Sequence, residues 1–380
     1  MRDNTIVAFF ALVRAGLWGE AYANLSLNVN DNLFEGVEWE KIYQLAQEQS
    51  VLGLVLAGLE QYKNLDVNLY VNQKLLLQWI GEVQLIEQRN KEMNQFIAEL
   101  VERMREMGIY TLLMKGQGVA QCYERPLWRS SGDVDFFLSD DNYKNAKDYL
   151  VPLATSVGEE FEYNKHLALI IEGWEVELHG NLYGGLWRGL DRAIKETQDD
   201  VFYGGSVRSW KNGNTQIFLP NANEDVFFVF THILQHYFKE GIGLRQICDW
   251  CRLLWIYRES IDKNKLAYRL KKAGVISEWQ VFANLAVCWL GMPLEAMPLY
   301  SNSKSINRRA KCVLDYIIET GNFGHNKDLS YKSEKSALKR KVKTFGHITG
   351  NVFRHMRVFP IDSIKVWCFE MLSGLRFSRR

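Results

Sequence analysis

The segment Leu112–Leu138, LLMKGQGVAQCYERPLWRSSGDVDFFL, decides the fold that we expect for this chain of 380 residues. Its last six residues, DVDFFL, predict a β-strand, because apolar and aromatic residues follow the turn formers Ser and Gly. Side chains two residues apart on a strand point to the same side, so Asp133 and Asp135 would present adjacent carboxylates. Two such charges repel unless a cation lies between them, and Mg²⁺ accepts carboxylate oxygens as ligands. The spacing therefore predicts a site for a metal and a nucleotide.

A third acid is expected from the segment WEVELH at residues 174–179, which alternates strictly and predicts another strand. Its apolar residues share one side, and Glu175, Glu177 and His179 share the other. If this strand pairs near the first, Glu177 completes a cluster of three carboxylates, with Glu175 as the alternative. Such a cluster can hold one or two metals, or accept the proton of an attacking hydroxyl group.

A pair of glycines, Gly116 and Gly118, lies where a strand over 110–114 is expected to meet a helix over 119–123. Backbone N–H groups at a helix N-terminus attract phosphate, and small residues allow it to approach. Glycines also serve turns and close packing, so the pair alone is a weak signal. The order of strand, glycine turn, helix, loop and acidic strand strengthens the interpretation as a nucleotide site.

Three polar residues around this segment have two interpretations each. Lys115 either neutralises phosphate charge or lies at a solvated strand end. Arg129 contacts the triphosphate or pairs with Asp133 or Asp135. Ser131 donates a hydrogen bond to a phosphate oxygen or caps the turn before the strand.

The histidines also have two interpretations each. His179 lines the site or is a packed, hydrogen-bonded histidine, and His166 either reaches the ligands or has no contact with them. His232 and His236 lie one helical turn apart. Without the glutamate of an HExxH arrangement, a metal role is weakly indicated. We expect them to face the cleft or to pack with Arg245 and Asp249.

The motifs LLMKGQG, RSSGDVDFF and VELH resemble the nucleotidyltransferase superfamily that includes DNA polymerase β. More narrowly, they resemble a bacterial branch of largely uncharacterised nucleotidyltransferases, over about residues 108–182. Gln117 stands where the superfamily usually has serine, and the gap to Asp133 is longer than usual. The segment GIGLRQICDW at 241–250 is also similar to the branch.

The resemblance implies an α+β fold, in which a nucleotidyltransferase-type mixed sheet lies between helical N-terminal and C-terminal domains. It implies transfer of an NMP group from a nucleoside triphosphate such as ATP to a hydroxyl acceptor, with release of pyrophosphate. Mg²⁺ is the implied cofactor, with Mn²⁺ as its alternative. The implied catalytic and metal residues are Asp133, Asp135 and Glu177. The implied nucleotide-binding residues are Lys115, Gly116, Gln117, Gly118, Arg129, Ser131 and His179.

Composition is ordinary for a globular chain, with 47% hydrophobic residues, 24% charged residues and a net charge of +1. No strong overall charge draws the chain to nucleic acid. The six cysteines lie mostly in apolar, helix-like surroundings, which predicts buried, reduced thiols and a cytoplasmic protein. Cys248 and Cys251 form a lone CxxC, for which we expect no zinc. No apolar run is long enough to span a membrane, and 1–20 is expected to be a helix rather than a signal peptide.

Four parts are expected along the chain: a helical N-terminal domain (1–107), the nucleotidyltransferase core (108–219), a helical C-terminal domain (220–325) and a basic helical tail (326–380). The core should end in a hairpin over 207–219, turning at Asn212-Gly213 or Gly213-Asn214. The tail has thirteen basic and four acidic residues, a net charge of +9. It is either a surface for polyanions or membranes, or a helical extension whose aromatic residues dock on the body.

Two other functions stay open. The chain could bind nucleotides or partners without catalysis, or bind nucleic acid through the basic tail. The acceptor is unknown: a small molecule, a protein and RNA are all compatible with the motifs.

Overall fold

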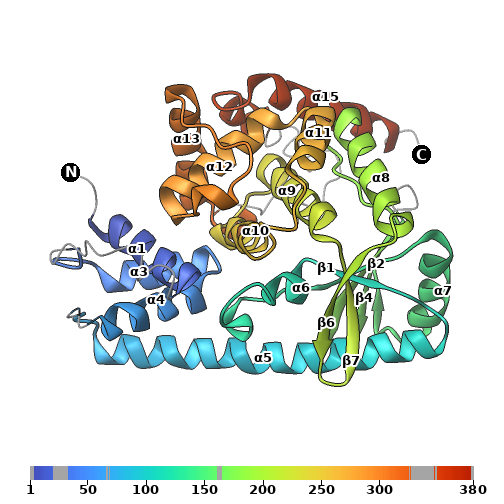
Figure 1. Cartoon of the computed structure of the whole chain (residues 1–380), viewed down its shortest axis with the longest axis horizontal. Coiled ribbons are helices and arrows are strands. Elements are labelled where there is room, and N and C mark those ends of the chain that lie inside the picture. The colour runs from blue at the N-terminus through green and yellow to red at the C-terminus, as the bar shows by residue number, and fades with distance from the viewer. Residues whose placement is uncertain are drawn as a thin grey trace.

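The computed structural model describes residues 4–19, 33–65, 67, 69–160, 165–324, 326, 346 and 349–377. It confirms the expected α+β class: helices surround a mixed sheet of five strands in the order β1-β2-β5-β4-β3 (Figure 1). β2 runs parallel to β5, and the other neighbouring pairs are antiparallel. The strands are β1 (Leu112–Met114), β2 (Val134–Phe137), β3 (Ser156–Val157), β4 (His166–Ile171) and β5 (Trp174–His179).

The two sides of the sheet differ in chemistry because its strands alternate. Val134 and Phe136 of β2 and Val176 and Leu178 of β5 are fully buried. They belong to an apolar cluster that also contains residues of α5 (Gln73–Glu106) and α7 (Asp140–Leu150). The opposite side carries the polar residues of both strands, so one side of the sheet is core and the other is available for a site.

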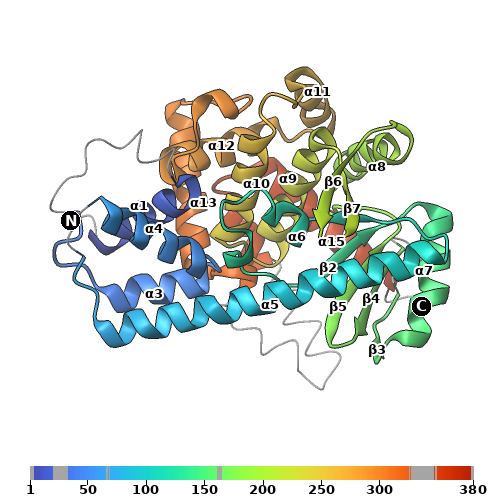
Figure 2. The same ribbon diagram turned by 60° about the horizontal axis from the view of Figure 1, so that its bottom comes forward.

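The long helix α5 connects two parts of the molecule. Its N-terminal half buries Trp79 and Val83 among the N-terminal helices, while its C-terminal half packs against the sheet. Figures 1 and 2 show α5 running past both groups. Asn72 caps the helix by accepting a hydrogen bond from the Lys74 amide, and Gly108 follows its end with φ +72°.

The N-terminal helices are α1 (Asn4–Trp18), α3 (Trp39–Glu48) and α4 (Leu52–Asn64). Glycine makes the α1–α4 crossing possible. A Cβ on Gly16 would lie 1.9 Å from the Leu54 carbonyl oxygen, and one on Gly58 would lie 2.0 Å from that of Leu12. Side chains at either position would force the helices apart.

The predicted hairpin is confirmed as β6 (Val207–Asn212) and β7 (Thr215–Pro220). Asn212 pairs with Thr215, so the two-residue turn is Gly213-Asn214. The remaining helices are α6 (Gly116–Ala120), α8 (Arg188–Tyr203), α9 (Ala222–Lys239), α10 (Leu244–Ile256), α11 (Lys263–Ala273), α12 (Ile276–Leu290), α13 (Lys304–Thr320) and α15 (Pro360–Phe377). Single 3₁₀ turns span Pro126–Trp128, Val151–Leu153, Leu294–Ala296 and Asn322–Gly324.

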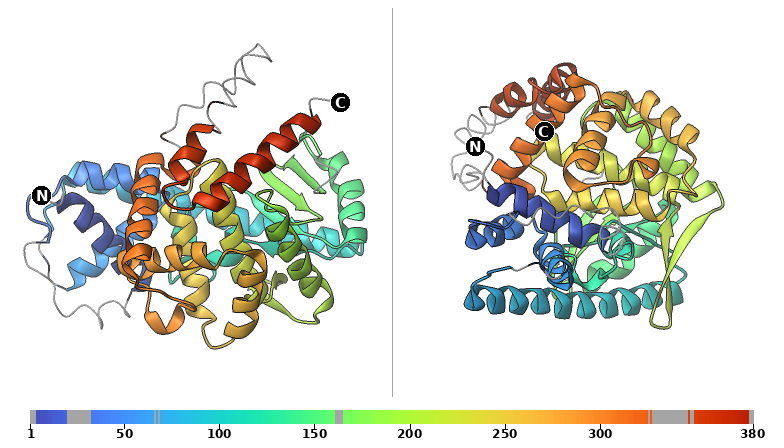
Figure 3. Two further views of the ribbon diagram at one scale, coloured as in Figure 1. Left: turned by 90° about the horizontal axis from the view of Figure 1, so that it is seen from above. Right: turned by 60° about the vertical axis from the view of Figure 1, so that its left-hand side comes forward.

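The helix α15 lies across the C-terminal helices on the side away from α5 (Figures 1 and 3). Phe359, just before it, is buried against the rings of Tyr237 and Phe238. This part of the tail thus docks on the body, as one of the two interpretations of its sequence expected, whereas the basic run at 327–345 lies outside the described residues. Among the helices that are described, none has the length and apolar character needed to cross a membrane.

Candidate active site

Three carboxylates meet on the polar side of the sheet. Asp135 on β2 is directly opposite Glu177 on β5 in the parallel register, and Asp133 lies just before β2. One ligand oxygen from each of these acids lies within 4.8 Å of the others. Glu175, the alternative third acid, is exposed and lines neither of the cavities at the site. The strand periodicity therefore identified the residues that come together.

Lys115 provides the positive charge beside this cluster. Its Nζ donates a hydrogen bond to Asp135 Oδ1 at 2.9 Å. Burial alone would lower the pKa of Lys115, but Asp135 and Asp133 outweigh it and the pKa is raised. The backbone at Lys115 has φ +51° and ψ −140°, a conformation that costs a residue with a Cβ about 1–3 kcal/mol. In this strained turn the Lys115 side chain points towards the carboxylates.

The two aspartates differ in their affinity for protons. The negative charge of Asp135, together with burial, raises the pKa of Asp133 to about 6. Burial also acts to raise the pKa of Asp135, but Lys115 and His179 outweigh it and keep that pKa below its ordinary value. Asp133 is thus the acid whose charge is least compensated by the protein, which is the situation that a bound cation would relieve.

Glu177 accepts contacts from two histidines. Its Oε2 lies 3.2 Å from His166 Nε2 and 3.2 Å from His179 Nε2, and His179 Nε2 also lies 2.8 Å from Asp135 Oδ1. Burial would raise the pKa of Glu177, but these two hydrogen bonds outweigh it and hold the pKa well below its usual range. A carboxylate this acidic is a better metal ligand than a proton acceptor.

The glycine turn is brought next to the acids, but its members have different surroundings. Gly116 opens α6 with φ +32° and lines a cavity with Asp133 and Asp135. At Gly118 a Cβ would lie 2.9 Å from Leu219 of the hairpin, so this glycine permits helix–hairpin packing. The side chain of Gln117 is buried and donates to Asn90 Oδ1 of α5 at 2.8 Å. It lines neither cavity, so only its main chain can reach a phosphate.

Arg129 is held by the C-terminal helices. Its Nε and Nη2 donate to the two carboxylate oxygens of Asp249 on α10, at 2.7 Å each, and both side chains are buried. Pairing with Asp133 or Asp135, one alternative expected from sequence, is therefore not the contact seen. Arg129 also lines the cavity that contains Gly116, so its contact with a triphosphate stays a prediction. Ser131 is half-buried and lines neither cavity.

Two cavities meet at the acids. One, of about 280 Å³, is lined by Gly116, Asp133 and Asp135 and by residues of α9 and α10. The other, of about 240 Å³, lies between the sheet, α8 and α9 and is lined by His166, His179 and mainly neutral groups such as Tyr183, Thr231 and Gln235. Four residues line both: Lys115, Glu177, His232 and His236.

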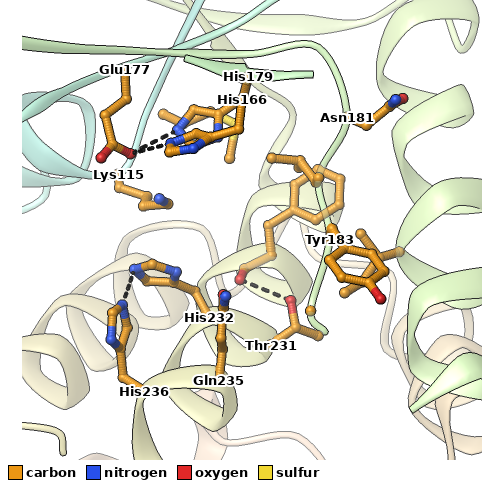
Figure 4. A pocket seen from close by; sticks show the side chains of 15 residues that line it. Lys115, His166, Glu177, His179, Asn181, Tyr183, Thr231, His232, Gln235 and His236 are labelled. Carbon is orange, nitrogen blue, oxygen red and sulfur yellow. Dashed lines mark hydrogen bonds and ion pairs between the residues drawn. The ribbon is translucent and has the colours of Figure 1, made fainter. Parts of the chain in front are cut away.

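Figure 4 shows His166, Glu177 and His179 converging on one side of the second cavity, with His232 and His236 rising from α9 on the other. The Nε2 atoms of His232 and His236 lie 3.0 Å apart. Burial and nearby Lys115 hold the pKa of His232 well below its ordinary value, so its ring is neutral near pH 7. Of the two alternatives expected for this pair, facing the cleft or packing with Arg245 and Asp249, the first agrees with its place in the lining of both cavities. Its position in both cavities depends on how α9 packs against the sheet.

A mixed sheet that presents clustered carboxylates beside a glycine turn is the arrangement of the nucleotidyltransferase class. The chain belongs to a family described as uncharacterised nucleotidyltransferases, which matches residues 35–291. Comparison with curated proteins and with solved structures found no match for this chain. The family supports nucleotidyl transfer in general terms. The match extends beyond the sheet into the N-terminal and C-terminal helices.

Proposed function

We propose that this protein is a metal-dependent nucleotidyltransferase that moves an NMP group from a nucleoside triphosphate to a hydroxyl acceptor and releases pyrophosphate. The observation that carries the proposal is the cluster of Asp133, Asp135 and Glu177 at the junction of two cavities. One cavity would hold the triphosphate beside the Gly116 turn. The other gives an acceptor hydroxyl access to the same acids.

The acids fit Mg²⁺ or Mn²⁺, because all three donors are carboxylate oxygens and the pKa of Asp133 is raised by its neighbour Asp135. We assign Asp133, Asp135 and Glu177 as the residues that would hold the ion. A divalent ion here would neutralise phosphate charge and lower the pKa of the attacking hydroxyl group.

The protein's own groups would position the reactants. Lys115 holds Asp135 ionised and directed at the cluster, and His166 and His179 do the same for Glu177. Backbone N–H groups at the start of α6, beside Gly116, would bind phosphate oxygens. In an in-line displacement the hydroxyl approaches the α-phosphorus opposite the leaving pyrophosphate. An in-line approach needs space for the hydroxyl group and for the pyrophosphate, and Glu177 lines both cavities. Fixed charges and fixed positions would provide most of the rate.

The test is isothermal titration with ATP, GTP, CTP and UTP, each with and without Mg²⁺. The wild-type protein is compared with the double variant Asp133→Asn/Asp135→Asn, and with Asp148→Asn as a control. Asp148 is an exposed aspartate on α7, so that control makes the same chemical change away from the site. We expect metal-dependent binding of at least one nucleotide, lost in the double variant and kept in the control. Equal affinity in all three proteins contradicts the proposal.

The main alternative is a protein that binds nucleotide without transferring it. Retention of all three acids and of both cavities favours the enzyme. Nucleotide binding without pyrophosphate release, for every class of hydroxyl acceptor tried, would support the alternative.

A further inference from the structure

Arg245 is a buried cation in an unfavourable position. It lies in the first turn of α10 and is 9% exposed. A helix N-terminus carries partial positive charge and favours anions, yet no acidic residue is present in this first turn. Arg129 is a second guanidinium close by, and burial together with Arg129 lowers the pKa of Arg245 to about 10. Each of these conditions disfavours a positive charge at this point.

Few protein groups compensate the charge. Over the part of the chain that the structure describes, the guanidinium donates one hydrogen bond, from Nη1 to the Ser130 carbonyl at 2.9 Å, and lies 5.7 Å from the centre of the Phe323 ring. Its Nε is buried without a partner. The neighbouring carboxylate of Asp249 already accepts two hydrogen bonds from Arg129 and one from the Tyr123 hydroxyl, at 2.7 Å each. Asp249 and Asp133 favour its charge only from a distance, and no ion pair joins Arg245 to a carboxylate among the described residues, so its guanidinium is only partly compensated.

The cavity beside Arg245 is the one that contains the candidate triphosphate site. The same 280 Å³ cavity is lined by Gly116 of the glycine turn and by Asp133 and Asp135 of the acid cluster. The cavity therefore brings Arg245 into the same space as the glycine turn and the acids. Guanidinium groups match phosphate oxygens with paired, charge-assisted hydrogen bonds. The acids on the same wall repel a free anion, so the ligand that fits both Arg245 and the acids is a phosphate group bound to a divalent cation.

We propose that Arg245 binds the terminal phosphates of the nucleoside triphosphate, and afterwards the pyrophosphate that leaves. The inference rests on the proposed function and extends it: the helical C-terminal part supplies a binding residue for the nucleotide, in addition to those on the sheet. The buried charge of Arg245 lowers the folding stability when no anion is bound, and it raises the affinity for an anion. Removing the charge should therefore weaken binding without lowering stability.

The experiment compares Arg245→Gln with the wild-type protein and with Arg308→Gln. Arg308 is exposed on α13, so this control removes the same charge away from the cavity. Affinities for inorganic pyrophosphate and for each nucleoside triphosphate are measured with Mg²⁺, and the Tm is measured without ligand. For Arg245→Gln we expect affinity to fall roughly 10- to 100-fold, the loss of charge-assisted hydrogen bonds, while the Tm is unchanged or higher. Arg308→Gln should alter neither. Arg245→Lys should recover part of the affinity, since it restores the charge without the paired geometry.

Unchanged affinity with a lower Tm would overturn the inference, because Arg245 would then be structural. The result also separates this inference from the proposed function. If the wild-type protein binds pyrophosphate through Arg245 but binds no nucleotide, the anion site stands and nucleotidyl transfer fails. If nucleotide binds equally well to wild type and to Arg245→Gln, the transferase proposal stands and the assignment of Arg245 fails. If neither ligand binds to the wild-type protein, both are overturned.

Discussion

Asp133 is the acid of the cluster at which a proton and a metal compete most directly. Its pKa of about 6 results first from the charge of Asp135 and then from burial. Below that pH a metal must displace a proton, so affinity should fall as the pH falls, by up to about tenfold per pH unit for one proton. We expect titrations with Mn²⁺ to give nearly constant affinity from pH 7 to 8 and weaker binding at pH 5. The Asp133→Asn variant is the comparison, since any pH dependence it retains belongs to other groups of the site. Equal affinity of the wild-type protein at pH 5 and pH 8 would contradict the assignment.

Gln117 tests whether a residue in the glycine turn acts through its side chain. The change Gln117→Leu removes the donor to Asn90 Oδ1 inside the protein and should lower the free energy of unfolding by about 1–3 kcal/mol. Because this side chain lines neither cavity, the affinity for Mg²⁺-nucleotide should stay within about twofold of wild type. Urea unfolding and isothermal titration measure the two quantities. Gln95→Leu, at an exposed position of α5, is the control and should change neither. A large loss of affinity without a loss of stability would contradict this prediction and would show that the Gln117 side chain binds the nucleotide.

Between elements, the buried pair of Arg129 and Asp249 ties the loop before β2 to α10. Asp249→Asn leaves the Arg129 guanidinium buried without its counter-ion, so unfolding free energy should fall by about 3–5 kcal/mol. The double variant Arg129→Met/Asp249→Leu should lose less than the sum of the two single variants, because no buried charge is left without its partner. Urea unfolding of the wild type, the single variants Arg129→Met and Asp249→Leu and the double variant measures this coupling, and the same measurement on Asp249→Asn gives the cost of the unpaired charge. A loss below about 1 kcal/mol in Asp249→Asn would show that the pair is unimportant for the fold.

The elements themselves were largely predictable from local periodicity. The strand expected at 174–179 has those bounds in the structure, and the hairpin expected over 207–219 is formed by Val207–Asn212 and Thr215–Pro220. Strict alternation also placed Glu177 on the polar side. The partners of Arg129 and Gln117 were not predictable, because they depend on packing between segments far apart. Arg129 and Asp249 are 120 residues apart in sequence, and no local pattern reports such a contact.

At the scale of the whole molecule, the helix α15 packs on the body through buried contacts, and one of the groups near them is a carboxyl group that can titrate. Glu278 in the first turn of α12 is fully buried, and Asp362 in the first turn of α15 is its acidic neighbour. Burial, followed by the effect of Asp362, raises the pKa of Glu278 to about 9. The folded protein therefore keeps this carboxyl group protonated at pH values where the unfolded chain has released the proton.

The sign of the pH dependence follows from that difference. The stabilising contribution of protonated Glu278 is complete below the ordinary pKa of 4.5 and is lost as the pH rises towards 9. Over that window the free energy of unfolding should fall by up to about 1.4 kcal/mol per pH unit from this one group. Glu278→Gln has nearly the same shape and no proton to lose, so its urea unfolding profile from pH 5 to 9 should be flatter, with greater stability than wild type at pH 8. Glu295→Gln, at an exposed glutamate, should follow the wild-type profile. If the profile of Glu278→Gln coincides with that of wild type, the carboxyl group is already ionised in the folded protein. The contact between α12 and α15 would then be insensitive to pH through this group.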